Sequence, residues 1–249
     1  MIPDRRPLLL GSGSPNVTKV MIMLEEIDMP CHRVWIDVMK GEQREDAFLA
    51  LNPNAKVPVF VDVVDGRDQV IAESGAILHY LAEQSAMLLG SSVRARTAVL
   101  SWLMFQMASV GPMFGQYLHF RFVSRDEPYA LHRFTTEMNR IVAVIEGQLG
   151  RHRHIAGENY SIADIATFSW IRTMTSFPSD ILEKPNMARW YADIAQRPAV
   201  ARALEYAEEF ASRDRERMVS ATRAERDVYF SRPAPTDAGV QDAAPRAQI

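Results

Sequence analysis

Residues 8–26, LLLGSGSPNVTKVMIMLEE, join a short apolar run to a periodic segment and decide how the chain begins to fold. Three leucines followed by a glycine are typical of a short buried strand. Apolar residues then recur at helical spacing from Val17 to Ile27, which predicts an amphipathic helix. Between them lies Ser14-Pro15-Asn16, whose serine can cap a helix and whose proline fits a first helical turn. The stretch therefore predicts a strand that leads directly into a capped helix.

The alternation of strand and helix continues to about residue 86. CHRVWIDV (31–38) alternates with period two, as a strand does, and REDAFLAL (44–51) indicates a short helix. VPVFVDVVDGRDQVIAE (57–73) contains two strand runs around Asp65-Gly66, a strong hairpin signal, and SGAILHYLAEQ (74–84) indicates another helix. The order is βαβ, helix, hairpin, helix. We expect a parallel first pair of strands with the hairpin added antiparallel.

From about residue 91 the strand signals stop. Long helices are expected over 94–120 and 128–149, and two more over 185–197 and 198–218. Ser161 with Asp164 three residues later indicates a capped buried helix between them. We predict an α/β domain over residues 1–87, an all-helical domain over 92–218, and an extended or disordered tail over 219–249.

The composition excludes several classes of function. A net charge of −3 provides no basic surface for nucleic acid or membranes, and no window approaches the roughly 18 apolar residues of a membrane span. The apolar run near the N-terminus is too short for a signal sequence. Six scattered histidines do not indicate a metal site. The single cysteine, Cys31, precludes an intramolecular disulfide and suits the reducing cytoplasm, where it is expected to be a buried apolar residue.

Several motifs occur in an order that resembles the glutathione S-transferase family, over nearly the whole chain. They are LNPNAKVPVFVD, ESGAILHYLAE, YSIADIA and QRPAV, and SPNVTKV, WLMFQMASVGPMFGQYLHFRF and HRFTTEMNR are similar to the Nu class. That class is related to the fungal nitrogen-catabolite repressor and to bacterial glutathione-dependent disulfide-bond reductases. The resemblance implies a thioredoxin-like N-terminal domain followed by a helical-bundle C-terminal domain, with glutathione as co-substrate and a homodimer as the assembly.

The resemblance also assigns site residues. Asn16 and Ser14 would address the sulfur of glutathione. The remaining glutathione contacts would be Gln43 and Lys56 at the glycine end, Val57 and the cis Pro58 at the cysteinyl unit, Glu73 and Ser74 at the γ-glutamyl end, and Arg133 from the second domain. Met113, Tyr117 and Phe120 would line an apolar pocket for the electrophile.

Each assignment has a plain structural alternative. Ser14 and Ser74 also suit helix caps, and Arg133 also suits a surface ion pair. Lys56 and Gln43 are more often simply solvated, and the methionines and phenylalanines of residues 104–122 are mostly core.

Uncharged donors at a helix start are sufficient for thiol activation. A thiol with a pKa near 8.5 is about 3% ionised at pH 7, and lowering that pKa by about two takes about 2.7 kcal/mol. A helix N-terminus supplies about 0.3–1 kcal/mol, up to about 2 when partly buried, and one hydrogen bond to a charged group about 1.5–3 kcal/mol. No Cys-x-x-Cys occurs at this junction, so the reactive thiol must arrive with the substrate.

The leading hypothesis is therefore a glutathione transferase whose activated thiolate attacks disulfides, peroxides or electrophilic, possibly aromatic, substrates. GQYLHF (115–120) departs from the GQNHHF of the bacterial reductases, so the preference among these substrates stays open. The alternative is a non-enzymatic regulator, or a protein that carries glutathione or apolar ligands, on the same scaffold.

Overall fold

In the computed structural model of the chain, the structure describes residues 2–3 and 5–230. Four strands form one sheet in the order β2-β1-β3-β4, namely β1 (Leu8–Gly11), β2 (His32–Trp35), β3 (Val59–Val64) and β4 (Arg67–Ala72). β1 and β2 are parallel and joined through α1 (Pro15–Glu26), and β3 is antiparallel to both β1 and β4. The expected parallel pair and antiparallel hairpin are confirmed.

The β3–β4 hairpin turns at the two residues predicted from the sequence. Val64 pairs with Arg67, so Asp65 and Gly66 form the whole connection. Both have positive φ, 52° and 72°. This is the backbone of a type I′ turn, in which Asp-Gly is favoured.

The sheet has two buried faces with different partners. Leu9 and Phe60 belong to the main core, which includes α1, α3 (Ser74–Ser85) and the helical domain. Leu8 and Leu10, which point to the other side, join a smaller cluster with Phe48. That cluster lies under η1 (Glu42–Arg44) and α2 (Asp46–Leu49), which form where one short helix was predicted. Leu8, Leu9 and Leu10 reach opposite faces in turn because successive side chains of a strand point to opposite sides of the sheet.

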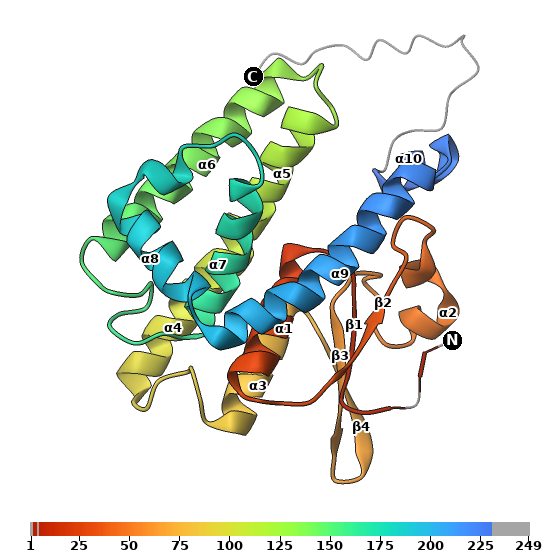
Figure 1. Cartoon of the computed structure of the whole chain (residues 1–249), viewed down its shortest axis with the longest axis horizontal. Coiled ribbons are helices and arrows are strands. Elements are labelled where there is room, and N and C mark those ends of the chain that lie inside the picture. Colours follow the sequence, from red (N-terminus) through yellow and green to blue (C-terminus); the bar gives the residue numbers. More distant parts are fainter. Residues whose placement is uncertain (1, 4, 231–249) are drawn as a thin grey trace, which may run out of the picture.

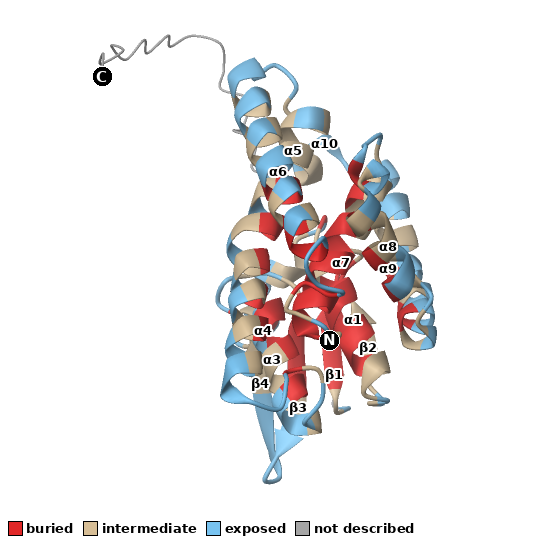
Figure 2. Ribbon diagram, turned by 90° about the vertical axis from the view of Figure 1, so that its left-hand side faces the viewer, coloured by how far each residue is buried: buried red, intermediate tan, exposed pale blue. Residues whose placement is uncertain are grey.

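The remainder of the described chain is helical and packs beside α1 and α3 (Figure 1). Its elements are α4 (Val93–Phe105), the π-helical turn η2 (Gln106–Val110), α5 (Gly111–Phe122), α6 (Pro128–Leu149), α7 (Ile162–Thr175), η3 (Ile181–Glu183), α8 (Pro185–Ala195), α9 (Pro198–Ser220) and α10 (Arg223–Tyr229). α1 packs against both α7 and α9. The most buried helix is α7, which lies at the centre of the molecule (Figure 2).

Asp164 closes the start of α7 as the sequence predicted. Its Oδ2 accepts from the backbone N–H and the hydroxyl of Ser161, both at 3.0 Å. Its Oδ1 accepts from the backbone N–H of Ile155 and from the indole of Trp190, both at 2.9 Å. Burial raises the pKa of this carboxyl above its usual range. Four donors to one fully buried side chain tie α7, α8 and the preceding loop together.

The long helix expected over 94–120 is present as the continuous stretch Val93–Phe122, which contains the π turn η2. Among the described residues it is the one helix long and apolar enough, by length and composition, to cross a membrane, and in this fold it packs against α6 and α7.

The tail predicted over 219–249 needs correction. α9 continues to Ser220, and α10 follows, because Thr222 and Glu225 form a capping box: the Glu225 carboxylate accepts from the Thr222 backbone N–H at 2.8 Å. The rest of that prediction, residues 231–249, lies outside the described residues.

Candidate active site

Ser14 is the N-cap of α1. Its Oγ accepts a hydrogen bond from the backbone N–H of Asn16 at 3.1 Å, and Pro15 occupies the first turn. The capping role that the sequence offered as an alternative is therefore present. Because the hydroxyl oxygen accepts in this bond, its hydrogen remains available to a second partner.

The side chain of Asn16 is oriented by a residue from the other domain. The indole Nε1 of Trp170, on α7, donates to Asn16 Oδ1 at 3.0 Å. The carbonyl end of the amide is thereby turned to the tryptophan, and the Nδ2 donor end is left for another partner. Trp170 was not predicted, since nothing near it in the sequence marks it as part of a site.

Asn16 lines a cavity of about 820 Å³ between the two domains. Its walls come from α1, the turn before α3, and the η2–α5 helix: Asn16, Lys19, Lys56, Glu73, Gln106, Met107, Gly111, Pro112, Gly115, Gln116, His119, Phe120, Trp170 and Tyr229. A smaller hollow of about 170 Å³ adjoins it through shared residues and is lined by Asn16, Asn52, Asn54, Lys56, Val57, Pro58, Glu73, Ser74 and Met107.

Six of the predicted site residues therefore meet at one place: Asn16, Lys56, Val57, Pro58, Glu73 and Ser74. The peptide bond between Val57 and Pro58 is cis, as expected. The loop before it is held by Asn52, whose Nδ2 donates to the carbonyl of Lys56 at 2.8 Å.

Glu73 connects the end of β4 to α3, and Ser74 is the first residue of α3. Glu73 is the N-cap and has a φ of 68°, an uncommon conformation for a residue with a side chain. Ser74 begins the helix and is buried, whereas Glu73 is exposed to the cavity side. A helix N-terminus with a hydroxyl and an adjacent carboxylate can receive a ligand that carries both an anion and an ammonium.

Two predicted glutathione residues lie elsewhere in this chain. Gln43 donates its side-chain Nε2 to the carbonyl of Val38 at 3.2 Å, beneath η1. Arg133, on α6, lines a separate hollow of about 640 Å³ together with Tyr129 and His132. The structure thus does not bring either side chain to the cavity with Asn16.

The structure places the three residues predicted for the electrophile pocket in different surroundings. Phe120 lines the main cavity, but Met113 faces the separate hollow beside Arg133, and Tyr117 packs against the main core. The cavity side of the helix carries Gly111, Gly115 and His119 instead. Gly111, Gly115, His119 and Phe120 thus lie on the side of α5 that faces the cavity, whereas Met113 faces the separate hollow.

A further aromatic hollow of about 640 Å³ extends the cavity through the shared residues Lys56, Gly115, His119 and Tyr229. Its other walls are Leu118, Phe122, Val123, Phe177 and Phe230. Phe122 and Phe177 stack with centroids 4.8 Å apart. Tyr229 and Phe230 belong to the end of α10, so the unpredicted last helix forms part of the wall.

Lys19 is the second residue that the sequence reading missed. It lies on α1 with no exposed surface, and its Nζ donates to Gln106 Oε1 at 2.8 Å and to Ser74 Oγ at 3.1 Å. Burial lowers its pKa to about 7, and the charge of Glu73 opposes that shift. A lysine inside the otherwise apolar run VTKVMIML was the available signal.

The loop before Ser14 is held from α9. The backbone N–H of Gly13 donates to Asp214 Oδ2 at 2.7 Å, and Trp35 Nε1 donates to Asp214 Oδ1 at 2.7 Å. Gly13 also lies against Ala211, where an added Cβ would be 2.5 Å from the backbone. Burial raises the pKa of Asp214.

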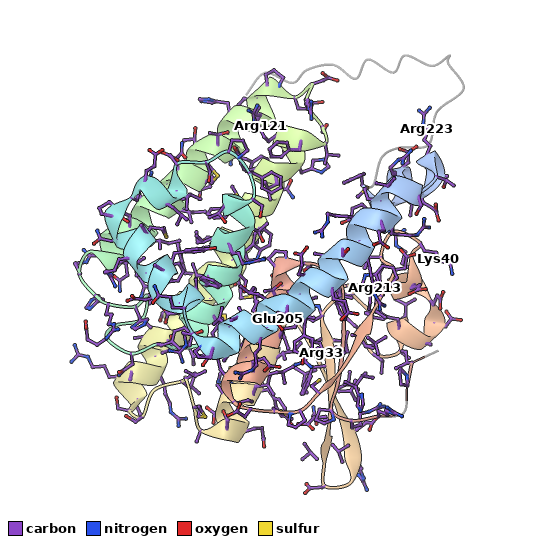
Figure 3. The ribbon with its side chains drawn as sticks, viewed as in Figure 1. Arg33, Lys40, Arg121, Glu205, Arg213 and Arg223 are labelled. Atoms are coloured by element: carbon purple, nitrogen blue, oxygen red, sulfur yellow. The ribbon has the colours of Figure 1, made fainter. Side chains whose placement is uncertain are left out.

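The same crossing of α9 over β2 carries two cation–π contacts, and Figure 3 labels their arginines. The guanidinium of Arg33 lies 3.8 Å from the ring centroid of Tyr206, and that of Arg213 lies 5.9 Å from that of Trp35. The loop is therefore clamped between its own helix and α9.

The described residues contain no group of three or more histidine, cysteine, aspartate or glutamate side chains that could hold a metal ion. The single cysteine, Cys31, is half-buried, and burial raises its pKa to about 12. A cysteine of that kind is a poor nucleophile. In this site the polar groups that meet are hydrogen-bond donors and one carboxylate, which suits binding of a polar ligand that supplies its own reactive atom.

Comparison with known proteins gives a consistent result. Residues 13–84 match the family model described as "Glutathione S-transferase, N-terminal domain", and residues 103–198 match "Glutathione S-transferase, C-terminal domain". The disulfide-bond oxidoreductase YfcG of Escherichia coli is 38% identical over 200 residues, which are 79% of this chain and 93% of that protein. Protein URE2 of Meyerozyma guilliermondii is 30% identical over 241 residues, covering 81% and 80%.

Solved structures are similar as well. A glutathione transferase from Burkholderia graminis, solved with two glutathione molecules bound per subunit, is 37% identical with a TM-score of 0.76, covering 80% of this chain and 88% of that one. A glutathione transferase YghU from Streptococcus pneumoniae, complexed with glutathione, is 32% identical with a TM-score of 0.78, covering 82% and 85%.

Proposed function

The chain belongs to the glutathione S-transferase family, among its Nu-class-like members, and from that premise we propose that it is a glutathione-dependent enzyme that activates the thiol of bound glutathione. The observation that carries the proposal is the Asn16 amide, which lines the cavity, whose oxygen accepts from Trp170 and whose donor end has no partner within residues 5–230. A donor fixed in this way stabilises a thiolate without any titrating residue.

Glutathione fits the cavity in one direction. Its γ-glutamyl carboxylate would lie at Ser74 and its ammonium near Glu73, because the helix start supplies donors and the carboxylate a counter-charge. The cysteinyl backbone would pair with Val57, and the glycine carboxylate would reach Lys56. The sulfur then lies at the start of α1, where Asn16 Nδ2 and the Ser14 hydroxyl donate and the helix dipole favours negative charge.

For the reaction itself we propose disulfide reduction or peroxide reduction first, and conjugation to electrophilic aromatic substrates second. In disulfide reduction, one glutathione thiolate attacks a substrate sulfur and expels the other as a thiolate. A second glutathione thiolate then attacks the glutathione sulfur of the mixed disulfide, which forms glutathione disulfide and expels the remaining substrate sulfur as a thiolate. No protein cysteine is needed, which agrees with the buried, weakly acidic Cys31. The relatives named as disulfide-bond oxidoreductases favour this order.

The test is Asn16→Ala, with Asn139→Ala on the exposed face of α6 as its matched control. Turnover with glutathione should fall at least about tenfold in Asn16→Ala, since one hydrogen bond to a charged sulfur is lost, and stay unchanged in the control. Thermal unfolding of both variants should match the wild type. Unchanged turnover in Asn16→Ala would refute the thiolate role.

The alternative, a regulator or a carrier on the same scaffold, predicts a different pattern. Retention on immobilised glutathione that is lost in Ser74→Ala supports the enzyme or carrier, whereas a bare protein-binding scaffold is not retained at all. A carrier differs from the enzyme in tolerating Asn16→Ala in every assay. A cytoplasmic location and a homodimer belong to the same proposal, and exposed apolar side chains on α4 and at the start of α6, among them Val93 and Tyr129, offer surface for the second subunit.

A further inference from the structure

Lys19 is a buried amine whose hydrogen-bond partners are all neutral, and Glu73 is the carboxylate whose charge acts on it. Its ammonium contacts Ser74 Oγ at 3.1 Å, Gln106 Oε1 at 2.8 Å and Met107 Sδ at 3.4 Å. Within residues 5–230 no carboxylate forms an ion pair with it. A fully buried ammonium without a counter-charge is expensive, and lysine almost never occurs fully buried unless it is paired. A folded protein keeps such a group at a cavity wall when an anion arrives there during function.

Gln106 provides a second, independent sign of a missing acceptor. Its Oε1 is used by Lys19, and its Nε2 is buried with no hydrogen-bond partner. Gln106 lies on the π turn η2, a geometry found frequently at functional sites, and both side chains line the main cavity. The wall between the two domains thus holds one buried donor on η2 with no hydrogen-bond partner among the described residues, beside the buried Lys19 amine, whose own donors go to Ser74, Gln106 and Met107. Unsatisfied donors around a cation are the complement of a carboxylate.

We propose that Lys19 is the positioning residue of the γ-glutamyl subsite: the α-carboxylate of glutathione, bound at Ser74, is its missing counter-ion. This inference rests on the proposed function. Lys19 donates to Ser74 Oγ at 3.1 Å, and the Ser74 hydroxyl in turn donates to Met107 Sδ at 3.8 Å. The ammonium therefore acts on a carboxylate bound at Ser74 through direct electrostatic attraction.

Binding of an anion beside Lys19 should be accompanied by uptake of a proton at its amine. Without ligand, burial lowers the pKa of Lys19 to about 7, so the neutral amine prevails at pH 8 and the ammonium at pH 6. The groups that face it are Ser74 from α3 and Gln106 and Met107 from η2, and Glu73 is the titratable residue whose charge acts on it. A carboxylate within a few ångströms favours the charged form, so the ligand draws a proton from the solvent.

Calorimetric titration with S-methylglutathione measures this directly, because that ligand has no thiol to ionise. Titrations at pH 6 and pH 8, each in two buffers of different ionisation enthalpy, give the number of protons taken up. We expect close to one proton at pH 8 and close to none at pH 6 in the wild type. Lys19→Met should take up none at either pH and should bind at least about tenfold more weakly at pH 6.

Lys56→Met is the matched control, since Lys56 lines the same cavity but is exposed. It should bind more weakly through the glycine end and still take up the proton at pH 8. Thermal unfolding separates a ligand-directed charge from a structural one: Lys19→Met should unfold at the same temperature as the wild type or higher, whereas a structural role would make it less stable.

The outcomes are distinct. A wild type that binds S-methylglutathione with the same proton count at pH 6 and pH 8 overturns the inference and leaves the proposed function intact, and this readout needs no variant to fold. Proton uptake that persists in Lys19→Met also overturns it. A wild type that binds no S-methylglutathione at either pH refutes the proposed function itself.

Discussion

Replacing Trp170 by phenylalanine tests how the site orients its main donor. The substitution keeps an aromatic ring in α7 but removes the indole N–H that holds Asn16 Oδ1 at 3.0 Å. Without that bond the amide can rotate and present its oxygen to the sulfur, where a negative charge develops. The variant should therefore bind glutathione normally and ionise it less readily.

The size of the effect follows from the bond that is lost. A partly buried neutral hydrogen bond contributes about 0.5–1.5 kcal/mol. At 1.36 kcal/mol per pKa unit, the pKa of the bound thiol should rise by about 0.4–1, and the rate at a pH below that pKa should fall about 2.5–10-fold. The absorbance of the bound thiolate near 240 nm, followed across pH, measures the first quantity, and kcat/KM at low pH measures the second.

Trp190→Phe is the matched control, because it removes the same kind of bond at a different place. Trp190 Nε1 donates to the buried Asp164 at 2.9 Å, away from the cavity. Its loss should cost about 1–3 kcal/mol of stability, which lowers the melting temperature by roughly 2–12 °C, and should leave the thiol pKa unchanged. If Trp170→Phe lowers stability and leaves the thiol pKa where it was, the indole has a packing role and the orientation argument fails.

Three further results are expected. Gly13→Ala should lower the free energy of unfolding by about 1–3 kcal/mol and reduce turnover, because the new Cβ would lie 2.5 Å from the backbone of Ala211. Gly147→Ala, in open space on α6, should not destabilise the protein. Melting temperatures and turnover rates of the two variants test this. Lys19→Met should be more stable than the wild type near pH 7, and this difference should shrink by about 2 kcal/mol towards pH 9. Native Lys19 loses its proton near pH 7 and the unfolded lysine near 10.4, so the free energy of unfolding of the wild type rises with pH between these values. Urea unfolding of both proteins at pH 7 and pH 9 measures the difference. Tyr229→Ala should raise the KM for an aromatic second substrate about 2–12-fold in steady-state assays, with the KM for glutathione changing less.

Features encoded within a few residues were predictable from the sequence. The capped start of α1 needs only Ser14 and Pro15, the hairpin needs only Asp65 and Gly66, and each forms as expected. Local hydrogen bonds and restricted dihedral angles determine such features, so a few adjacent residues are enough to predict them.

The partners of the site residues were not predictable in this way. Trp170 meets Asn16 across 154 positions, and Asp214 meets Gly13 across 201. Such contacts depend on how complete elements pack, which no local spacing specifies. The predicted electrophile pocket depends on packing in the same way, because which side of α5 faces the cavity is decided by how that helix packs against α6 and α7, and Phe120 lines the cavity whereas Met113 lines the separate hollow.

Gly13 and Asp214, which holds its backbone, are far apart in the sequence, and this has a consequence for synthesis. A ribosome releases the loop that carries Ser14 about two hundred residues before Asp214 emerges, so a growing chain holds this loop with one side unsupported. The chemistry can begin only after α9 has been translated and laid across β2. A premature stop codon anywhere before α9 should therefore yield a fragment without turnover, even one that keeps every residue expected to touch glutathione.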